Sequence, residues 1–119
     1  MNLTDLDATF LRLKEQDGSR WSETGGAFDG ADGVMFLCPK CYAANMAKCG
    51  DGRMGTHMVM CWFVGRVPDG IDPKPGRWTP SGTGLHDLTF VPGSPARAVS
   101  VLLTAGCGWH GFVRDGDAA

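Results

Sequence analysis

The sequence lacks the features that would place it in several common classes of protein. It has no apolar run near the roughly 20 residues needed to cross a membrane, and residues 1–10 carry acidic groups where a secretory signal is basic. Its 11 Lys and Arg against 13 Asp and Glu give a net charge of −2, and the basic residues are scattered singly. We therefore expect a cytoplasmic protein that has neither a membrane nor a nucleic acid as its partner.

The chain also has no complete set of catalytic residues. His86 and Asp87, with Ser81, Thr83 and His57 elsewhere in the chain, supply acid, base and hydroxyl groups. Nothing in their spacing requires them to converge. His86 is better explained as a turn residue, with Asp87 capping the next backbone segment. We predict no catalytic residue, and keep a small metal-dependent enzyme or nucleic-acid-processing factor as the alternative.

Glycine and proline, by contrast, are abundant. The 18 Gly and 7 Pro make up about a fifth of the 119 residues, against roughly 12% in average proteins. Turns and extended segments should therefore outnumber helices, which predicts a mainly β (α+β) fold. A chain of this length fits one domain, residues 1–119, with a modest core to which a metal cross-link would add stability.

Two pairs of potential metal ligands stand far apart in the sequence. Cys38 and Cys41 form a Cys-x-x-Cys pair, and Cys107 and His110 form a Cys-x-x-His pair. The two-residue spacer lets both side chains of a pair bind one ion, and zinc takes four such ligands in a tetrahedron. Three thiolates and one imidazole leave no open position, so we predict one structural zinc ion per chain in a small zinc-ribbon-like antiparallel β domain. Trp109 should pack over this site.

Three further residues are alternative ligands. Cys49, His57 and Cys61 could replace one or two of the four, although their spacings of eight and four residues are less characteristic of zinc sites. Without a metal, Cys61 would be a small buried residue and Cys49 a free thiol in a loop. A Cys-x-x-Cys pair also occurs in redox proteins, but there it lies in a βαβ unit, and no such pattern surrounds Cys38.

The N-terminal part of the chain, residues 1–33, combines a helical pattern with an irregular one. Apolar residues recur at helical spacing from Leu3 to Leu13 and predict one short helix over residues 4–13. Residues 14–33 are rich in glycine and acidic groups. They favour an irregular arm or a short hairpin over a core element.

The remaining residues, 34–119, should form the zinc-held β core. Short apolar or β-branched runs predict strands at 34–37, 57–64, 77–79, 87–91, 99–104 and 111–114. The longest of these runs, residues 57–64, should be the central strand of the sheet, with both of its faces covered.

A Pro- and Gly-rich segment, residues 68–76, should form a rigid surface loop because it cannot sustain a β-ladder. It is the expected interaction loop. The predicted partner contacts are Pro73 and Lys74 within it, and Arg77 and Trp78 directly after it. Trp78 is the aromatic residue that we expect to be partly exposed and to anchor a partner.

Several segments together resemble a family of small uncharacterised bacteriophage and prophage proteins. They are Ala-Asp-Gly-Val-x-Phe-Leu-Cys-Pro-x-Cys at 31–41, Gly-Thr-His at 55–57, Cys-Trp-Phe at 61–63, Pro-Gly-Arg-Trp at 75–78, Ser-Gly-Thr-Gly-Leu at 81–85, Asp-Leu-Thr at 87–89 and Cys-Gly-Trp-His-Gly-Phe-Val at 107–113. The resemblance implies phage origin and a zinc-binding β fold. It does not indicate an activity.

With a closed ligand set and no catalytic residues, the expected function is protein interaction. The partner would be a host factor, including a defence complex, or a protein of the virion, and the location would be the bacterial cytoplasm or the virion itself. Two segments depart from the family pattern: residues 44–49 replace a Gly-rich turn, and residues 92–97 extend a short link. These two segments are where we expect adaptation to a particular partner.

Overall fold

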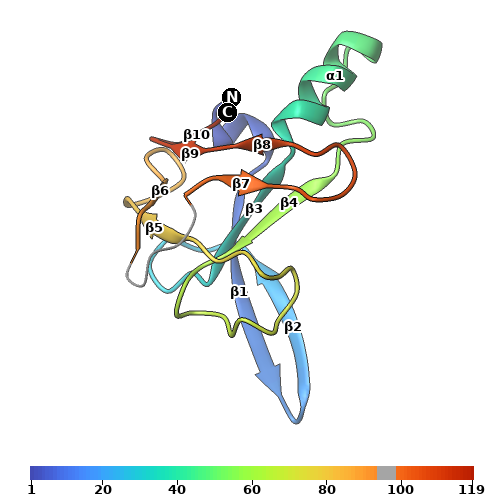
Figure 1. The fold of residues 1–119 in the computed structure, drawn as a ribbon. Helices are drawn as coiled ribbons and strands as arrows, with labels where there is room; N and C mark the ends of the chain where they lie inside the picture. The colour runs from blue at the N-terminus through green and yellow to red at the C-terminus, as the bar shows by residue number, and fades with distance from the viewer. Residues whose placement is uncertain (94–98) are drawn as a thin grey trace.

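A four-stranded antiparallel sheet is the largest element of the fold (Figure 1). Its strands are β1 (Thr9–Gln16), β2 (Ser19–Thr24), β3 (Gly33–Leu37) and β4 (Met58–Trp62), in the spatial order β2-β1-β3-β4. The computed structural model describes residues 1–93 and 99–119. In these residues antiparallel strands predominate, which confirms the prediction of a mainly β fold.

Three short antiparallel pairs complete the β structure. β5 (Thr79–Ser81) pairs with β6 (Thr89–Val91), β7 (Val101–Leu102) with β8 (His110–Gly111), and β9 (Val113–Arg114) with β10 (Asp117–Ala118). Between β9 and β10, Asp115 (φ 49°) and Gly116 (φ 75°) form the tight turn that the Asp-Gly sequence indicates. Most of the expected family-specific segment 92–97 lies outside the described residues.

The prediction of a helix over residues 4–13 is wrong beyond its first turn. A 3-10 helix, η1, spans only Leu3–Leu6 and ends at Asp7, which has a left-handed conformation. From Thr9 the chain is extended, because β1 pairs with β2 along one edge and with β3 along the other. Pairing on both edges outweighs a weak helical propensity. β1 and β2 form a long hairpin that projects from the body, where the sequence indicated an irregular arm or a hairpin (Figure 1).

Strand β4 lies at an edge of the sheet, not at its centre as predicted. The expectation that both of its faces are covered is confirmed. Val59 and Cys61 lie in the main hydrophobic core, whereas Trp62 packs on the opposite face with Leu11 and Val67. The long apolar run therefore reflects two cores on either side of one strand, and it says nothing about how many strands flank it.

One α-helix, α1 (Pro39–Cys49), stands where the sequence was interpreted as a loop. Pro39 occupies its first turn, a position that tolerates proline because no intrahelical bond is lost there. Gly50 ends the helix in a left-handed conformation, and its N–H donates to the Met46 carbonyl at 2.9 Å. These two signals were present in the sequence and were missed. The helix begins directly after Cys38, so it positions the first ligand pair.

Candidate metal centre

Three cysteines and one histidine converge at one end of the sheet. The ligand atoms of Cys38, Cys41, His57 and Cys107 all lie within 4.8 Å of one another. Three of these four residues belong to the ligand set predicted from the sequence. The fourth, His57, was one of the alternatives.

The ends of β3 and β4 position Cys38 beside His57. The Cys38 N–H donates to the His57 carbonyl at 3.0 Å, which extends the ladder of these two strands by one pair. Cys38 is also the N-cap of α1, and its carbonyl accepts the Tyr42 N–H at 2.9 Å. Because Cys41 lies in the first turn of this helix, its thiol is on the same side as that of Cys38. Local backbone structure thus brings three of the four ligand atoms together.

The loop between β7 and β8 supplies the fourth ligand, Cys107. Gly106 (φ 66°) and Gly108 (φ 67°) flank it in left-handed conformations, which most other residues adopt only with strain. The ammonium group of Lys40 donates to the Cys107 carbonyl at 2.8 Å. Helix α1 therefore holds the loop through a polar contact in addition to any contact through a metal.

The distances within the group match those of a tetrahedral site. Cys38 Sγ lies 3.6 Å from Cys107 Sγ, and His57 Nε2 lies 3.4 Å from the same sulfur. Four ligands at Zn–S of about 2.3 Å and Zn–N of about 2.0–2.1 Å would be separated by about 3.8 Å (S to S) and about 3.6 Å (S to N). A group of this composition and size can hold one metal ion.

The second nitrogen of His57 is oriented as in many metal-bound histidines. Its Nδ1 lies 3.3 Å from the Met58 carbonyl oxygen. With a metal bound at Nε2, the remaining ring proton would lie on Nδ1 and be shared with this oxygen, and such a contact fixes the orientation of the ring. This supports His57 as a ligand beyond its distance alone.

His110 is not part of this group. It lies in β8, is exposed, and has its ring 6.3 Å from that of Phe112. The preceding residue, Trp109, is buried and packs edge-on against Phe36 at 6.0 Å, in the main core cluster to which Cys38 also belongs. Because side chains alternate along an extended chain, burying Trp109 turns His110 outward. The Cys-x-x-His spacing is therefore not used as a chelating pair.

The two remaining cysteines also lie outside the group. Cys61 is fully buried in the main core, where burial raises the pKa of its thiol. Cys49 is exposed at the end of α1, and its sulfur lies 3.2 Å from the Asn45 carbonyl oxygen. Their positions match the interpretation of a small core residue and a free thiol.

The three clustered thiols differ in acidity. The hydrogen bond from His57 lowers the pKa of Cys107 to about 6, while burial raises the pKa of Cys38, and burial together with the neighbouring thiols raises that of Cys41 to about 12. Of the three clustered thiols, that of Cys107 is therefore the most acidic in the metal-free protein. The other two thiols must lose protons when an ion binds, because the thiolate is the ligand.

Two of the residues considered for catalysis, Thr83 and Asp87, form a structural turn. The Asp87 carboxylate accepts hydrogen bonds from the Thr83 N–H at 2.8 Å, the Thr83 hydroxyl at 2.8 Å and the Gly84 N–H at 2.9 Å. These bonds lower the pKa of Asp87 to about 2. Asp87 is a capping carboxylate, but it caps the preceding turn at Thr83 and Gly84 and not the next backbone segment as predicted. The His86 side chain is largely exposed beside it.

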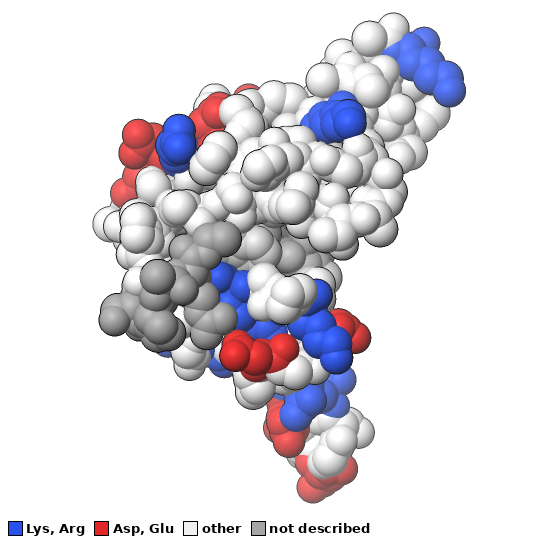
Figure 2. Space-filling model, viewed as in Figure 1, with Lys and Arg blue, Asp and Glu red and all other residues white. Residues whose placement is uncertain are grey.

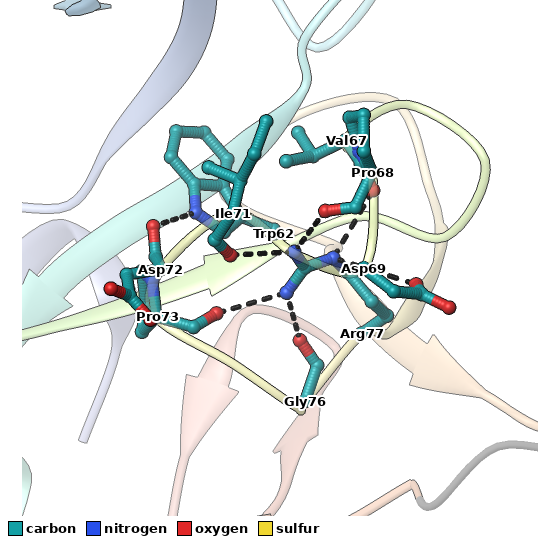
Figure 3. Close-up of polar contacts among 9 residues, drawn as sticks. All are labelled: Trp62, Val67, Pro68, Asp69, Ile71, Asp72, Pro73, Gly76 and Arg77. Carbon is teal, nitrogen blue, oxygen red and sulfur yellow. Dashed lines mark hydrogen bonds and ion pairs between the residues drawn. The ribbon is translucent and has the colours of Figure 1, made fainter.

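The predicted interaction loop is organised around the side chain of Arg77, which is only 3% exposed (Figure 3). Its guanidinium donates to five backbone carbonyls, those of Val67 (3.2 Å), Pro68, Ile71 (2.7 Å), Pro73 (2.9 Å) and Gly76 (2.7 Å). Arg77 therefore stabilises the loop from within, and its side chain does not face a partner. The indole N–H of Trp62 also holds the loop, by donating to the Asp72 carbonyl at 2.9 Å.

The other three predicted partner contacts border a groove of about 560 Å³, which His57 also lines. They are Pro73, Lys74 and Trp78. Trp78 is half-buried, stacks on Phe90 at 5.7 Å and donates its indole N–H to the Ser100 carbonyl at 3.0 Å. The loop and the ligand group therefore meet at the same surface feature.

Fold and site together define a small, mainly β protein with a Cys3His group that can bind a metal ion. Comparisons with protein-family models, with curated proteins and with solved structures found no match. In the part of the chain that the structure describes, no helix is long and apolar enough to cross a membrane.

Proposed function

We propose that this chain is a phage-encoded zinc-binding protein that acts as a protein-interaction module, with one structural zinc ion held by Cys38, Cys41, His57 and Cys107. The observation that carries the proposal is the convergence of these four ligand atoms within 4.8 Å. Soft thiolates with one imidazole are the donors that zinc prefers in closed structural sites.

A zinc ion at this position would cross-link distant parts of the chain. Cys38 and Cys107 are 69 positions apart, and they lie at the end of β3 and in the β7–β8 loop. Because the ion would bind the folded chain, its binding free energy would add to folding stability. The four protein ligands would leave no position for water or substrate, which is the arrangement of a structural site.

The sequence resemblance supports phage origin, and the distribution of surface charge supports a protein partner. The segments that resemble small phage and prophage proteins include all four residues of the ligand group and the Pro-Gly-Arg-Trp segment at 75–78. The partner would be a host factor, such as a defence complex, or a virion protein. Figure 2 shows acidic and basic residues interspersed over the β1–β2 hairpin and a largely uncharged band across the middle of the same face. This distribution favours a protein surface over a phosphate backbone as the partner.

A small metal-dependent enzyme is the second candidate, and one observation favours it. His57 belongs to the ligand group and also lines the groove, so a ligand in the groove would lie next to the ion. Catalysis would require one of the four ligands to leave the ion, because a catalytic zinc keeps a position for water.

Native mass spectrometry of untagged protein, purified gently from bacterial cells infected by the phage that encodes it, tests the proposal. We expect one zinc ion per chain and a bound host or virion protein. Folded protein without metal would contradict the zinc assignment. A reproducible turnover that is lost in His57→Ala would contradict the interaction function and favour the enzyme.

A further inference from the structure

The groove lies between two loops that are held by different means. One wall is the Arg77-centred loop with Trp78, and the other wall is the segment that leads from β7 towards Cys107. Its lining residues are His57, Met60, 73–76, Trp78 and 100–106. A volume of about 560 Å³ is within the usual range for ligand-binding clefts. Most of the lining is apolar, and Lys74 is the one Lys, Arg, Asp or Glu among these described residues.

The edge of β4 presents unpaired backbone groups to this groove. The bonds from the Cys38 N–H to the His57 carbonyl and from the Phe63 N–H to the Asp32 carbonyl show that odd-numbered residues of this segment face β3. The N–H and C=O groups of even-numbered residues therefore point away from β3.

Trp78 uses part of this free edge. Its N–H donates to the Trp62 carbonyl at 3.1 Å, and its carbonyl accepts the Val64 N–H at 2.8 Å. Further along β4, the backbone groups of Met60 have no partner among the described residues. Met60 lines the groove.

The opposite wall contains a second strand edge. The Leu103 N–H donates to the Trp109 carbonyl at 2.9 Å, so Leu103 faces β8 and the backbone groups of Leu102 face away from it. The Ser100 carbonyl, two residues earlier on the same side, accepts the indole N–H of Trp78 across the groove. The side chain of Leu102 is 57% exposed, so it is accessible to a partner.

From these observations we propose that the groove binds an extended peptide segment of a partner protein, which pairs with the free edge of β4 at Met60. The segment would carry a large apolar side chain for the space beside Trp78 and Leu102, and a carboxylate that reaches Lys74. The inference rests on the proposed interaction function and names the chemistry of the partner.

The backbone edges decide between an extended peptide and other occupants. A small apolar molecule would fill the volume but would leave the N–H and C=O groups of Met60 and Leu102 unpaired, at a free-energy cost if water is excluded. An added strand satisfies them, and alternate side chains of that strand would point into the apolar space. The single positive charge at Lys74 favours an acidic residue or a chain-terminal carboxylate next to the apolar one.

A selection from a random linear peptide library displayed on filamentous phage, on immobilised zinc-loaded protein, tests the inference. We expect selected peptides to share a large apolar residue near a carboxylate. Synthetic copies should bind at least tenfold more weakly to Leu102→Asp and severalfold more weakly to Lys74→Glu. Met54→Asp, at an exposed methionine outside the groove lining, should bind like the wild type.

Amide hydrogen exchange of the complex tests the pairing itself. The Met60 N–H should become protected when a selected peptide binds, and N-methylation of the pairing residue of the peptide should abolish this protection. Binding that is unchanged in Leu102→Asp, or an exposed Met60 N–H in the complex, would overturn the inference. The inference would also be overturned if the library yields no binder, or if the protein self-associates and Leu102→Asp abolishes that self-association.

The outcomes for this inference and for the proposed function can be told apart. A protein that contains one zinc ion and retains a natural partner after Leu102→Asp would keep the interaction function and lose only the groove. Melting temperature and zinc content of each variant show that it is folded.

Discussion

The two walls of the groove are irregular loops that are held in place in two different ways. The acceptors of the Arg77 guanidinium are at most 10 positions away in the sequence, so this side chain organises its own neighbourhood. The ligand group joins residues up to 69 positions apart. Arginine carries a permanent charge, whereas a bound ion can be removed by a chelator or by acid. Loss of the ion should therefore affect the whole fold, and loss of Arg77 mainly one loop.

Removal of the metal should have the largest effect. Cys38→Ser, or incubation of the wild type with a strong chelator, should leave the protein unfolded or aggregated. Zinc contributes about 10–16 kcal/mol in small zinc-binding peptides, as much as the whole stability of a typical domain. Far-UV circular dichroism and thermal melting measure this. A melting curve that is unchanged after the metal has been removed would break the comparison.

Loss of the arginine should have a smaller, local effect. Arg77→Ala leaves the five loop carbonyls without this donor and should lower the free energy of unfolding by about 3 kcal/mol, as measured by urea denaturation. Arg77→Lys, with three donors, should recover only part of this. The matched control is Arg53→Ala, which removes an exposed ion pair with Asp7 and should cost less than about 1 kcal/mol.

Zinc content, measured together with stability, tests whether the two loops are held independently of each other. Arg77→Ala should keep one zinc ion per chain and should lose binding of groove-selected peptides. If Arg77→Ala also lost the metal, the two loops would be one cooperative unit.

Zinc binding, and with it the loop that carries Cys107, should depend on pH, whereas the charge of Arg77 is permanent. The pKa values of Cys38 and Cys41 are raised in the metal-free protein, so zinc binding at neutral pH should release one proton from each. Below pH of about 6 the Cys107 thiolate also gains a proton, and zinc affinity should fall more steeply with acidification. Calorimetry in buffers of different ionisation enthalpy counts these protons. Zinc binding without proton release at neutral pH would contradict the ligand assignment.

The smallest effect is expected at Cys49, which lies outside both the ligand group and the Arg77-centred loop. Cys49→Ser should change the free energy of unfolding by less than about 0.5 kcal/mol, because the thiol is exposed. Its zinc content should equal that of the wild type. Loss of metal in Cys49→Ser would show that the four-residue group is not the binding site.

Much of the fold could be predicted from composition and alternation. Abundant glycine and proline indicated a mainly β chain, and the run at 57–64 indicated a strand covered on both faces. The helical spacing of Leu3 and Leu6 was real for one turn only, because pairing with β2 and β3 then keeps the chain extended. Helix α1 was missed because its apolar face is weak, although Pro39 and Gly50 marked both of its ends.

The candidate site shows what spacing can and cannot reveal. The Cys-x-x-Cys pair is local, so its geometry follows from one helical turn. The histidine ligand is the residue that lies opposite Cys38 where β3 and β4 pair. That pairing register cannot be read from spacing along the chain. His57 is that residue, while the core packing of Trp109 turns His110 outward.

The central claim is that His57, and not His110, completes a structural zinc site with the three cysteines. Native mass spectrometry of the wild type, His57→Ala and His110→Ala under stepwise addition of a chelator tests it most directly. The wild type and His110→Ala should each retain one zinc ion at chelator concentrations that strip His57→Ala. Zinc retained by His57→Ala but lost by His110→Ala, or a folded wild type without metal, would contradict the account.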